Sequence, residues 1–238
     1  MPRLDILVTR SGLAESRERA QALIIAGKVR VAGETVRRPD RAVSDDAAIS
    51  VEEGPAYASR GALKLGPALT TFGVDPAGLV CADIGASTGG FTDVLLRRGA
   101  ARVYAIDVGR GLLHWRLRQD PRVVVIERVN ARELETFPEP VSLIVIDVSF
   151  IGLEKVLPAM RHAAPEAEVI ALFKPQFQVG RSEVGKGGIV RDQQAIDAAL
   201  DAFRVWCEAN GYALKAQAPS ELPGMDGNQE IFLELVPS

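Results

Sequence analysis

The chain has 238 residues, of which 47% are hydrophobic and 25% are charged, an ordinary balance for a globular protein. Nowhere do 18 apolar residues follow one another, and the opening MPRLDILVTRSG holds no long apolar stretch. We therefore expect neither a membrane span nor a signal peptide, and we predict a cytoplasmic protein. The two cysteines, Cys81 and Cys207, lie in apolar segments, which predicts buried free thiols rather than a disulfide framework.

The net charge of −3 is unevenly distributed along the chain. Between Arg3 and Arg41 there are nine lysines or arginines against five acidic residues, so the remainder of the chain is acidic. A basic N-terminal segment followed by an acidic remainder is typical of a nucleic-acid-binding module attached to an enzyme. A solvated charged face produces the same asymmetry, so charge alone leaves both interpretations open.

The first sixty residues predict a small α+β module. Apolar residues recur on one helical face of LDILVTRSGL and again of Ser16–Ala26, so we expect two short helices. Ser16 is the expected N-cap of the second helix, and Gly27 is the expected residue just beyond its end. VRVAGETV and AAISVEE then predict three short strands, the first two joined at Ala32 and Gly33.

A domain boundary is expected in EEGPAYAS, where Gly54 and Pro55 break any regular element, and we divide the chain into residues 1–59 and 60–238. Beyond it, five strand-like runs lack period-two alternation, as expected of strands covered on both faces. They are LVCADIG, ARVYAID, RVVVIE, VSLIVID and EVIALFK, and they alternate with helical segments such as FTDVLLRRG and EKVLPAMRHA. This alternation predicts an α/β domain with a Rossmann-like, doubly wound sheet, which GYALKAQ and EIFLELV complete as an antiparallel pair.

A glycine-rich turn, DIGASTGGFT, joins the first strand of this domain to its first helix. Such a turn lets a ligand approach the backbone at a helix N-terminus. Its pattern departs from the dinucleotide-binding motif at Ser87, and the Asp83 ahead of it is more typical of S-adenosylmethionine sites. The next strand ends in Asp107, at the spacing where a carboxylate accepts hydrogen bonds from ribose hydroxyls. The candidate cofactor-binding residues are Asp83, Gly85, Ser87, Gly89, Gly90 and Asp107. A nicotinamide cofactor and a purely structural turn both remain open.

Four polar residues lie where a reaction centre is expected. Asp147 and Lys174 end the fourth and fifth strands, so both point over the carboxyl edge of the sheet. Lys64 precedes the first strand, and Glu230 opens the last. Each of the latter two has a simpler explanation, because Lys64 could lie on the surface of an amphipathic helix and Glu230 could be an edge-strand charge.

Together, Lys64, Asp147, Lys174 and Glu230 resemble the K-D-K-E tetrad of the FtsJ-type ribose 2′-O-methyltransferases. SRGALKL, DIGASTGGFTDVLL, DPRVVVIERVNAR, DVSFI, LFKPQFQVG and GNQEIFLEL further resemble the signature segments of the TlyA family. Members of that family join an S-four-type RNA-binding domain, to which SRERAQALIIAGKVRVAGETV is similar, to an FtsJ-type methyltransferase domain. The resemblance covers nearly the whole chain. It departs ahead of SRG, where the family often has Trp and this chain has Tyr57 and Ala58.

The resemblance implies S-adenosylmethionine-dependent 2′-O-methylation of a cytidine in the ribosomal RNA of ribosomal subunits, without a metal. Lys174 is the expected central residue, acting as a base if burial and a like charge such as Lys64 lower its pKa from about 10.4. Asp147 and Glu230 are then expected to orient the two amines. A role for Lys174 in oxyanion stabilisation alone remains open, as does the oligomeric state. The expected RNA contacts are Arg3, Arg10, Arg17, Arg19, Lys28 and Arg30, and Asn130 is expected near the adenine of the cofactor.

Other functions fit the sequence less well. Methylation at carbon five of a pyrimidine needs a cysteine nucleophile, but Cys81 lies in a strand and Cys207 in a late helix. The amino-methylating enzymes usually carry a polar residue, two prolines and an aromatic where this chain has DVSF. A pore-forming haemolysin lacks support because no membrane segment is present. Pseudouridine synthases share the RNA-binding module, and Arg3-Leu4-Asp5 echoes their motif, but their catalytic domain is missing. An RNA-binding assembly factor with an inactive methyltransferase fold is the remaining alternative.

Overall fold

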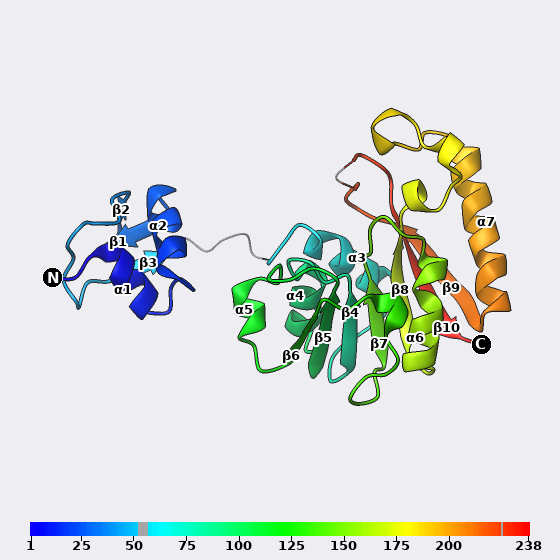
Figure 1. Cartoon of the computed structure of the whole chain (residues 1–238), viewed down its shortest axis with the longest axis horizontal. Coiled ribbons are helices and arrows are strands. Elements are labelled where there is room, and N and C mark those ends of the chain that lie inside the picture. Colours follow the sequence, from blue (N-terminus) through cyan, green and yellow to red (C-terminus); the bar gives the residue numbers. More distant parts are fainter. Residues whose placement is uncertain (52–56, 225) are drawn as a thin grey trace. The chain divides into compact units, whose positions relative to one another are not determined.

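The computed structural model describes residues 1–51, 57–224 and 226–238 (Figure 1). The chain divides into two compact units, Met1–Ala56 and Tyr57–Ser238. The expected break at Gly54 and Pro55 lies outside the described residues. The division falls three residues before the expected one, because Tyr57 and Ala58 contact helix α4 (Gly90–Arg97) of the second unit.

The first unit consists of two helices and a small antiparallel sheet. Its elements are α1 (Leu4–Arg10), α2 (Arg17–Ile25), β1 (Val29–Val31), β2 (Glu34–Val36) and β3 (Ile49–Val51), with the strands in the order β2-β1-β3. The Ser16 hydroxyl accepts a hydrogen bond from Arg19 N at 3.1 Å, which confirms the expected N-cap. Ala32 and Gly33 both have positive φ, as a two-residue hairpin turn requires. The predicted α+β module is therefore confirmed.

The second unit is built on a seven-stranded sheet in the order β6-β5-β4-β7-β8-β10-β9. The strands are β4 (Val80–Ile84), β5 (Arg102–Asp107), β6 (Val123–Glu127), β7 (Leu143–Ile146), β8 (Glu168–Phe173), β9 (Tyr212–Pro219) and β10 (Ile231–Pro237). The first five are parallel, whereas β10 pairs antiparallel with both β8 and β9. This arrangement confirms the doubly wound sheet and its antiparallel closing pair.

Helices cover both faces of this sheet. They are α3 (Ala62–Phe72), α4, α5 (Trp115–Arg118), α6 (Leu157–Ala163) and α7 (Gln193–Ala209). Short 3₁₀ turns lie at η1 (Ala131–Glu133), η2 (Leu153–Lys155), η3 (Pro175–Phe177), η4 (Arg181–Glu183) and η5 (Lys186–Gly188). The sequence patterns left α3 undecided and missed α5, because a four-residue helix has too few positions to show a 3.6-residue period. No helix in the described part of the chain has the length and apolar character needed to cross a bilayer.

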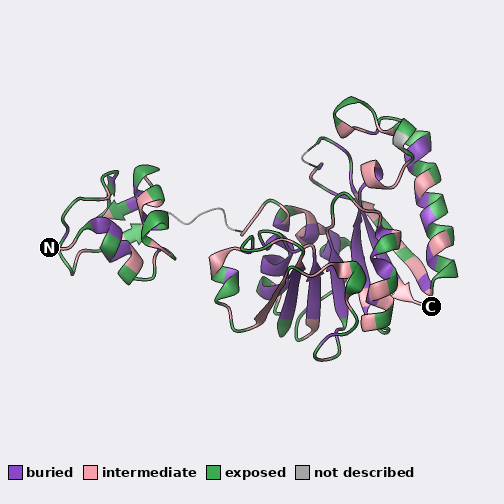
Figure 2. Cartoon of the chain, in the orientation of Figure 1, coloured by how far each residue is buried: buried purple, intermediate pink, exposed green. Residues whose placement is uncertain are grey.

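The alternation of buried residues explains the continuous apolar runs of the strands. In β7, Leu143 and Val145 pack with α3 and α4 on one face, whereas Ile144 and Ile146 pack with α6 and α7 on the other. Both faces of the strand are therefore dry, and Figure 2 shows the central strands as buried while the outer sides of the helices are exposed. The strand order reverses between β4 and β7. In such folds the crevice outside the carboxyl ends of the strands at this switch point is the usual ligand site.

Candidate active site

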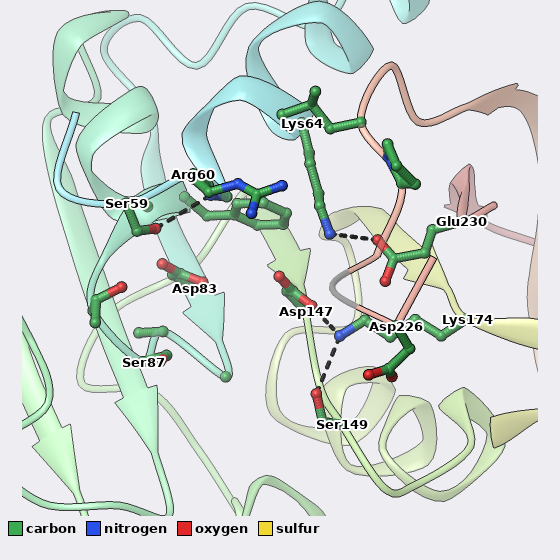
Figure 3. A pocket seen from close by; sticks show the side chains of 18 of the residues that line it. Ser59, Arg60, Lys64, Asp83, Ser87, Asp147, Ser149, Lys174, Asp226 and Glu230 are labelled. Carbon is green, nitrogen blue, oxygen red and sulfur yellow. Dashed lines mark hydrogen bonds and ion pairs between the residues drawn. The ribbon is translucent and has the colours of Figure 1, made fainter. Parts of the chain in front are cut away.

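A cavity of about 730 Å³ opens at this switch point. Its volume lies within the range of small-molecule sites. Eight of the eleven predicted catalytic and cofactor-binding residues line it, and Figure 3 shows several of them facing one another. The eight are Lys64, Asp83, Gly85, Ser87, Gly90, Asp147, Lys174 and Glu230.

Lys174 and Asp147 follow two neighbouring parallel strands, β8 and β7. Lys174 Nζ lies 2.5 Å from Asp147 Oδ1 and donates a hydrogen bond to Ser149 Oγ at 3.2 Å. The lysine is only 8% exposed, and a buried ammonium group is stable only with such partners. The two strand ends therefore hold one charged pair in a fixed place beside the cavity.

Lys64 and Glu230 form a second pair at 2.5 Å, between Lys64 Nζ and Glu230 Oε2. Lys64 comes from α3, and Glu230 directly precedes β10. Because β10 runs antiparallel to β8, with Ile231 opposite Phe173, the start of β10 lies at the same sheet edge as Lys174. The side chain of Lys64 is 13% exposed, and β10 lies between two other strands, so neither the surface-lysine nor the edge-strand explanation holds.

The pairing of charges is consistent with the expected role of Asp147 and Glu230 in orienting the two amines. Each amine contacts a carboxylate, as the dashed lines in Figure 3 show. The expected effect of Lys64 as a like charge on Lys174 stays a prediction. Opposite charges in contact lower the electrostatic energy of the cluster, so the four groups form two balanced pairs.

Asp83 lies fully buried at the base of the cavity, in β4. Its Oδ2 accepts hydrogen bonds from Thr92 N at 2.8 Å and from Thr92 Oγ1 at 2.6 Å. Its Oδ1 is buried and meets no hydrogen-bond partner among the described residues. Burial, together with the nearby Asp147 carboxylate, raises the pKa of Asp83 to about 7. This carboxyl group can therefore receive a hydrogen bond from a ligand in the cavity.

The glycines of the turn allow segments of the protein to approach one another closely. A Cβ atom on Gly85 would lie 2.3 Å from the carbonyl oxygen of Asp147, and one on Gly90 would lie 2.2 Å from Ser59 Oγ. Gly89 has φ +92°, a backbone conformation that L side chains rarely adopt. The turn is thus packed tightly against β7 and the segment before α3, which fixes its shape at the cavity wall.

Asp107 braces the same turn. Its Oδ2 accepts a hydrogen bond from Ser87 N at 2.8 Å, and its Oδ1 accepts one from Gly109 N at 2.7 Å. Asn130 accepts a hydrogen bond from Arg132 N at 3.2 Å and thereby caps η1. Gly89, Asp107 and Asn130 lie outside the residues that line the cavity. Their part in cofactor binding therefore stays a prediction, although each carboxylate oxygen of Asp107 has a second lone pair for a ribose hydroxyl.

Comparison with known proteins finds a matching family for each of the two units. Residues 2–49 match the S4 domain, and residues 57–235 match the FtsJ-like methyltransferase. The chain is 49% identical over 238 residues to the 16S/23S rRNA (cytidine-2′-O)-methyltransferase TlyA of Mycobacterium tuberculosis, covering 98% of this chain and 89% of the relative. The chain belongs to the TlyA family. It therefore carries a methyltransferase domain and an RNA-binding domain, as the sequence predicted.

Two further relatives of this TlyA-family chain carry a different name. Hemolysin A of Brachyspira hyodysenteriae is 45% identical, covering 98% of this chain and 99% of the relative. A solved structure from Streptococcus thermophilus, named as a candidate hemolysin, is 40% identical with a TM-score of 0.75 and covers 99% of this chain and 88% of that one.

An aromatic pair that the sequence analysis did not single out also lines the cavity. Phe150 is 91% exposed, and its ring centroid lies 5.4 Å from that of Phe177. Phe150 has φ +65°, which is a strained conformation for a bulky residue. Further lining residues that were not singled out are Ser59, Arg60, Ser149 and Gln176. They occur in the family segments SRGALKL, DVSFI and LFKPQFQVG, but those segments do not reveal which side chains reach the cavity.

The two cysteines are buried and free, as predicted. Burial raises the pKa of the Cys81 thiol to about 12, which opposes formation of a thiolate nucleophile. Neither Cys81 nor Cys207 lines the cavity, so the site gives no support to a cysteine-dependent methylation of a base. In the part of the chain that the structure describes, no group of three or more acidic, histidine or cysteine side chains is placed to hold a metal.

All six residues expected to contact RNA lie exposed in the first unit. They are Arg3, Arg10, Arg17, Arg19, Lys28 and Arg30. Three of them contact carboxylates of the same unit, because Arg3 and Arg17 bind Asp5 and Arg10 binds Asp45. The TlyA-family chain thus presents a set of basic side chains on the domain whose family binds RNA.

Proposed function

We propose that this chain methylates the 2′-hydroxyl of a cytidine in ribosomal RNA and uses S-adenosylmethionine as the methyl donor. The observation that carries the proposal is the convergence of two lysine–carboxylate pairs beside the glycine turn of a methyltransferase fold. Lys64 comes from α3, Asp147 and Lys174 directly follow β7 and β8, and Glu230 directly precedes β10, so four separate segments bring these residues to one edge of the sheet.

The cavity fits the proposed cofactor. S-adenosylmethionine supplies a methyl group on a positively charged sulfur. Asp83 offers a buried carboxyl oxygen without a partner among the described residues, and Ser87 and Gly90 line the same wall. We infer that these residues hold the cofactor. We further infer that its nucleoside part extends beyond the cavity and contacts Asp107 and Asn130, which do not line the cavity. A carboxyl group beside a cationic ligand also compensates its charge.

The reacting hydroxyl needs help because a ribose hydroxyl is a very weak acid. Lys174 Nζ is the amine held between two oxygens, Asp147 Oδ1 and Ser149 Oγ, and it lines the cavity. We infer that Lys174, as an ammonium, stabilises the oxygen as its negative charge develops, or that it receives the hydroxyl proton after it has lost its own. Asp147 positions this amine, and Glu230 positions that of Lys64. Positioning by packed partners matters because a displacement reaction requires alignment of the attacking oxygen.

The substrate class is supported by the S4 domain and by the exposed aromatic pair. Exposed aromatic rings beside a reaction site are typical of proteins that stack unpaired RNA bases. Phe150 and Lys174 line the same cavity, and we infer that a base stacked on this ring holds its ribose in that cavity. Cytidine and ribosomal RNA are inferred from the name of the 49% identical relative. A ribosomal substrate also agrees with a cytoplasmic location.

The deciding experiment is a reaction of the purified chain with unmodified 16S and 23S ribosomal RNA, free and in subunits, and a cofactor carrying a labelled methyl group. We expect label in RNA, and mapping by mass spectrometry should place it on the 2′-oxygen of a cytidine. Label on a base would contradict the proposed chemistry. RNA binding without methyl transfer, combined with no cofactor binding by calorimetry, would favour an assembly factor instead.

A further inference from the structure

A fully buried carboxylate in the first unit holds two of its exposed arginines. Asp5 lies at the start of α1 and is 0% exposed. Its Oδ1 accepts hydrogen bonds from Arg3 Nε at 3.1 Å and from Ile6 N at 3.0 Å. Its Oδ2 accepts hydrogen bonds from Arg3 Nη2 at 3.1 Å, Arg17 Nε at 3.0 Å and Gln21 Nε2 at 2.8 Å. Residues from before α1 and from α2 therefore converge on one carboxylate.

The hydrogen bonds keep this carboxylate ionised. Burial by itself raises the pKa of Asp5, but the hydrogen bonds from Arg3, Gln21 and Arg17 outweigh burial, and the pKa lies well below its ordinary value. Asp5 thus carries a full negative charge that attracts both guanidinium groups. One carboxylate between two arginines leaves a net charge of about +1 on the cluster at neutral pH.

The two arginine side chains are about half exposed, and each keeps a terminal nitrogen without a hydrogen-bond partner among the described residues. The side chains of Arg3 and Arg17 are 44% and 49% exposed, although their inner nitrogens contact a buried group. Arg17 uses Nε on Asp5, and within the described residues its two Nη atoms meet no hydrogen-bond partner. Arg3 likewise leaves Nη1 without a partner in the described part of the chain. These terminal nitrogens are the groups that bind phosphate oxygens in pairs.

We propose that Asp5 organises Arg3 and Arg17 into a clamp for a phosphate of the RNA backbone. The inference rests on the proposed function, because it takes the S4 domain of this chain as the part that binds the RNA substrate. An arginine on a free surface loses rotamer freedom when it binds a phosphate, whereas an arginine already held by Asp5 has lost much of it beforehand. Asp5 is thus a positioning residue that increases RNA affinity although its own charge repels RNA.

Asp5→Asn tests the clamp, because the charge of Asp5 and its positioning of the arginines have opposite effects on RNA affinity. Removing a negative charge from a basic surface should by electrostatics alone tighten RNA binding. Loss of the clamp should weaken it, and we expect about a tenfold weaker Kd for the full chain. The probe is an in vitro transcript of unmodified 23S ribosomal RNA, titrated at several salt concentrations. We also expect a shallower dependence of log Kd on log salt, because fewer phosphates are contacted.

The matched control is Asp40→Asn, which changes the net charge equally in the same unit. Asp40 pairs with Arg38 on the surface, where the two side chains are 52% and 79% exposed. We expect this variant to bind the transcript as tightly as the wild type or more tightly. An Asp5→Asn variant that binds as tightly as Asp40→Asn would overturn the clamp.

A second variant covers the case in which Asp5→Asn fails to fold. The double substitution Arg3→Lys and Arg17→Lys keeps both charges and changes only half-exposed side chains, but it removes the planar fork. We expect about a tenfold loss of RNA affinity, and unchanged affinity would overturn the proposal. Circular dichroism at the assay temperature checks that the variant is folded, because Asp5 loses hydrogen bonds from both guanidinium groups and the Tm should fall. If the wild-type chain itself does not bind the transcript, the proposed function fails, and the clamp fails with it. If the wild-type chain binds the transcript and the variants bind it equally well, the clamp proposal fails and the proposed function stands.

Discussion

Lys64 Nζ lies 2.5 Å from Glu230 Oε2, although 166 positions separate the two residues in the chain. This contact joins the first helix of the methyltransferase domain to the start of β10, and both residues line the cavity. Both side chains are largely buried, so replacing one would leave the other charge without compensation. The pair therefore ties two segments that are distant in the sequence to one wall of the cavity.

Substitutions of Lys174 distinguish between two roles of this residue, as a proton acceptor or as a fixed positive charge. We expect Lys174→Ala to lower the single-turnover methylation rate by about 10²- to 10⁴-fold while cofactor and RNA affinities change little, since the lost interaction belongs to the transition state. Lys174→Arg should be almost as damaging, because guanidinium keeps the charge but does not release a proton at accessible pH.

Two outcomes of the Lys174 experiment are decisive. A nearly active Lys174→Arg variant would show that positive charge is sufficient and would exclude proton abstraction by this residue. A Lys174→Ala variant with the wild-type single-turnover rate on ribosomal substrate would remove the catalytic assignment of the four residues altogether.

Asp107→Ala should weaken S-adenosylmethionine binding by about 1 to 3 kcal/mol, because a hydrogen-bonded carboxylate is lost. The loss also frees Ser87 N and Gly109 N, which Asp107 now binds, so the glycine turn should loosen. Isothermal calorimetry measures the affinity, and thermal unfolding without cofactor checks the fold. Unchanged affinity would place Asp107 outside the cofactor site.

Cofactor binding should depend on pH through Asp83, whose pKa burial raises to about 7. Below this pH the carboxyl group is mostly protonated in the free protein, and a cationic cofactor beside it favours the ionised form. Binding should therefore release a proton, and affinity should fall by up to about tenfold per pH unit as the pH drops below 7. Calorimetry in buffers of different ionisation enthalpy measures the release. Asp83→Asn should abolish it, and equal proton release by this variant would assign the effect to another group.

Phe150→Ala should lower kcat/KM for the RNA substrate by an amount equivalent to about 1 to 3 kcal/mol, the usual contribution of one stacked base. Phe150 is 91% exposed, so its loss should leave the Tm and the cofactor affinity unchanged. Phe150→Tyr is the matched control, because it keeps the ring and should keep most of the activity. Wild-type kcat/KM for the alanine variant would argue against base stacking at this ring.

Removal of residues 1–56 should abolish methylation of ribosomal substrate but preserve cofactor binding. The second unit, Tyr57–Ser238, has its own buried core and contains every residue that lines the cavity. The truncated chain is assayed by calorimetry with S-adenosylmethionine and by label transfer to ribosomal subunits. Full-rate methylation by the truncated chain would show that the S4 domain is not needed for substrate recognition.

The sequence by itself determined the class of the fold and the candidate reacting groups. Apolar strand runs alternating with helices specify a doubly wound sheet, because parallel strands must be covered on both faces. A lysine and an aspartate that close two such runs must lie at one edge of the sheet, so Lys174 and Asp147 could be named in advance. Lys64 and Glu230 were candidates by their positions in the chain, and the resemblance to the K-D-K-E tetrad joined them to this set.

Only the tertiary structure decided which of these groups touch. Lys64 contacts Glu230, and Lys174 contacts Asp147, because antiparallel β10 begins at the edge where β8 ends, a register that local patterns do not encode. The sequence patterns likewise did not predict the exposure of Phe150 or the burial of Asp5 between two arginines. Both depend on packing against residues distant in sequence, and propensity and periodicity describe only neighbours along the chain.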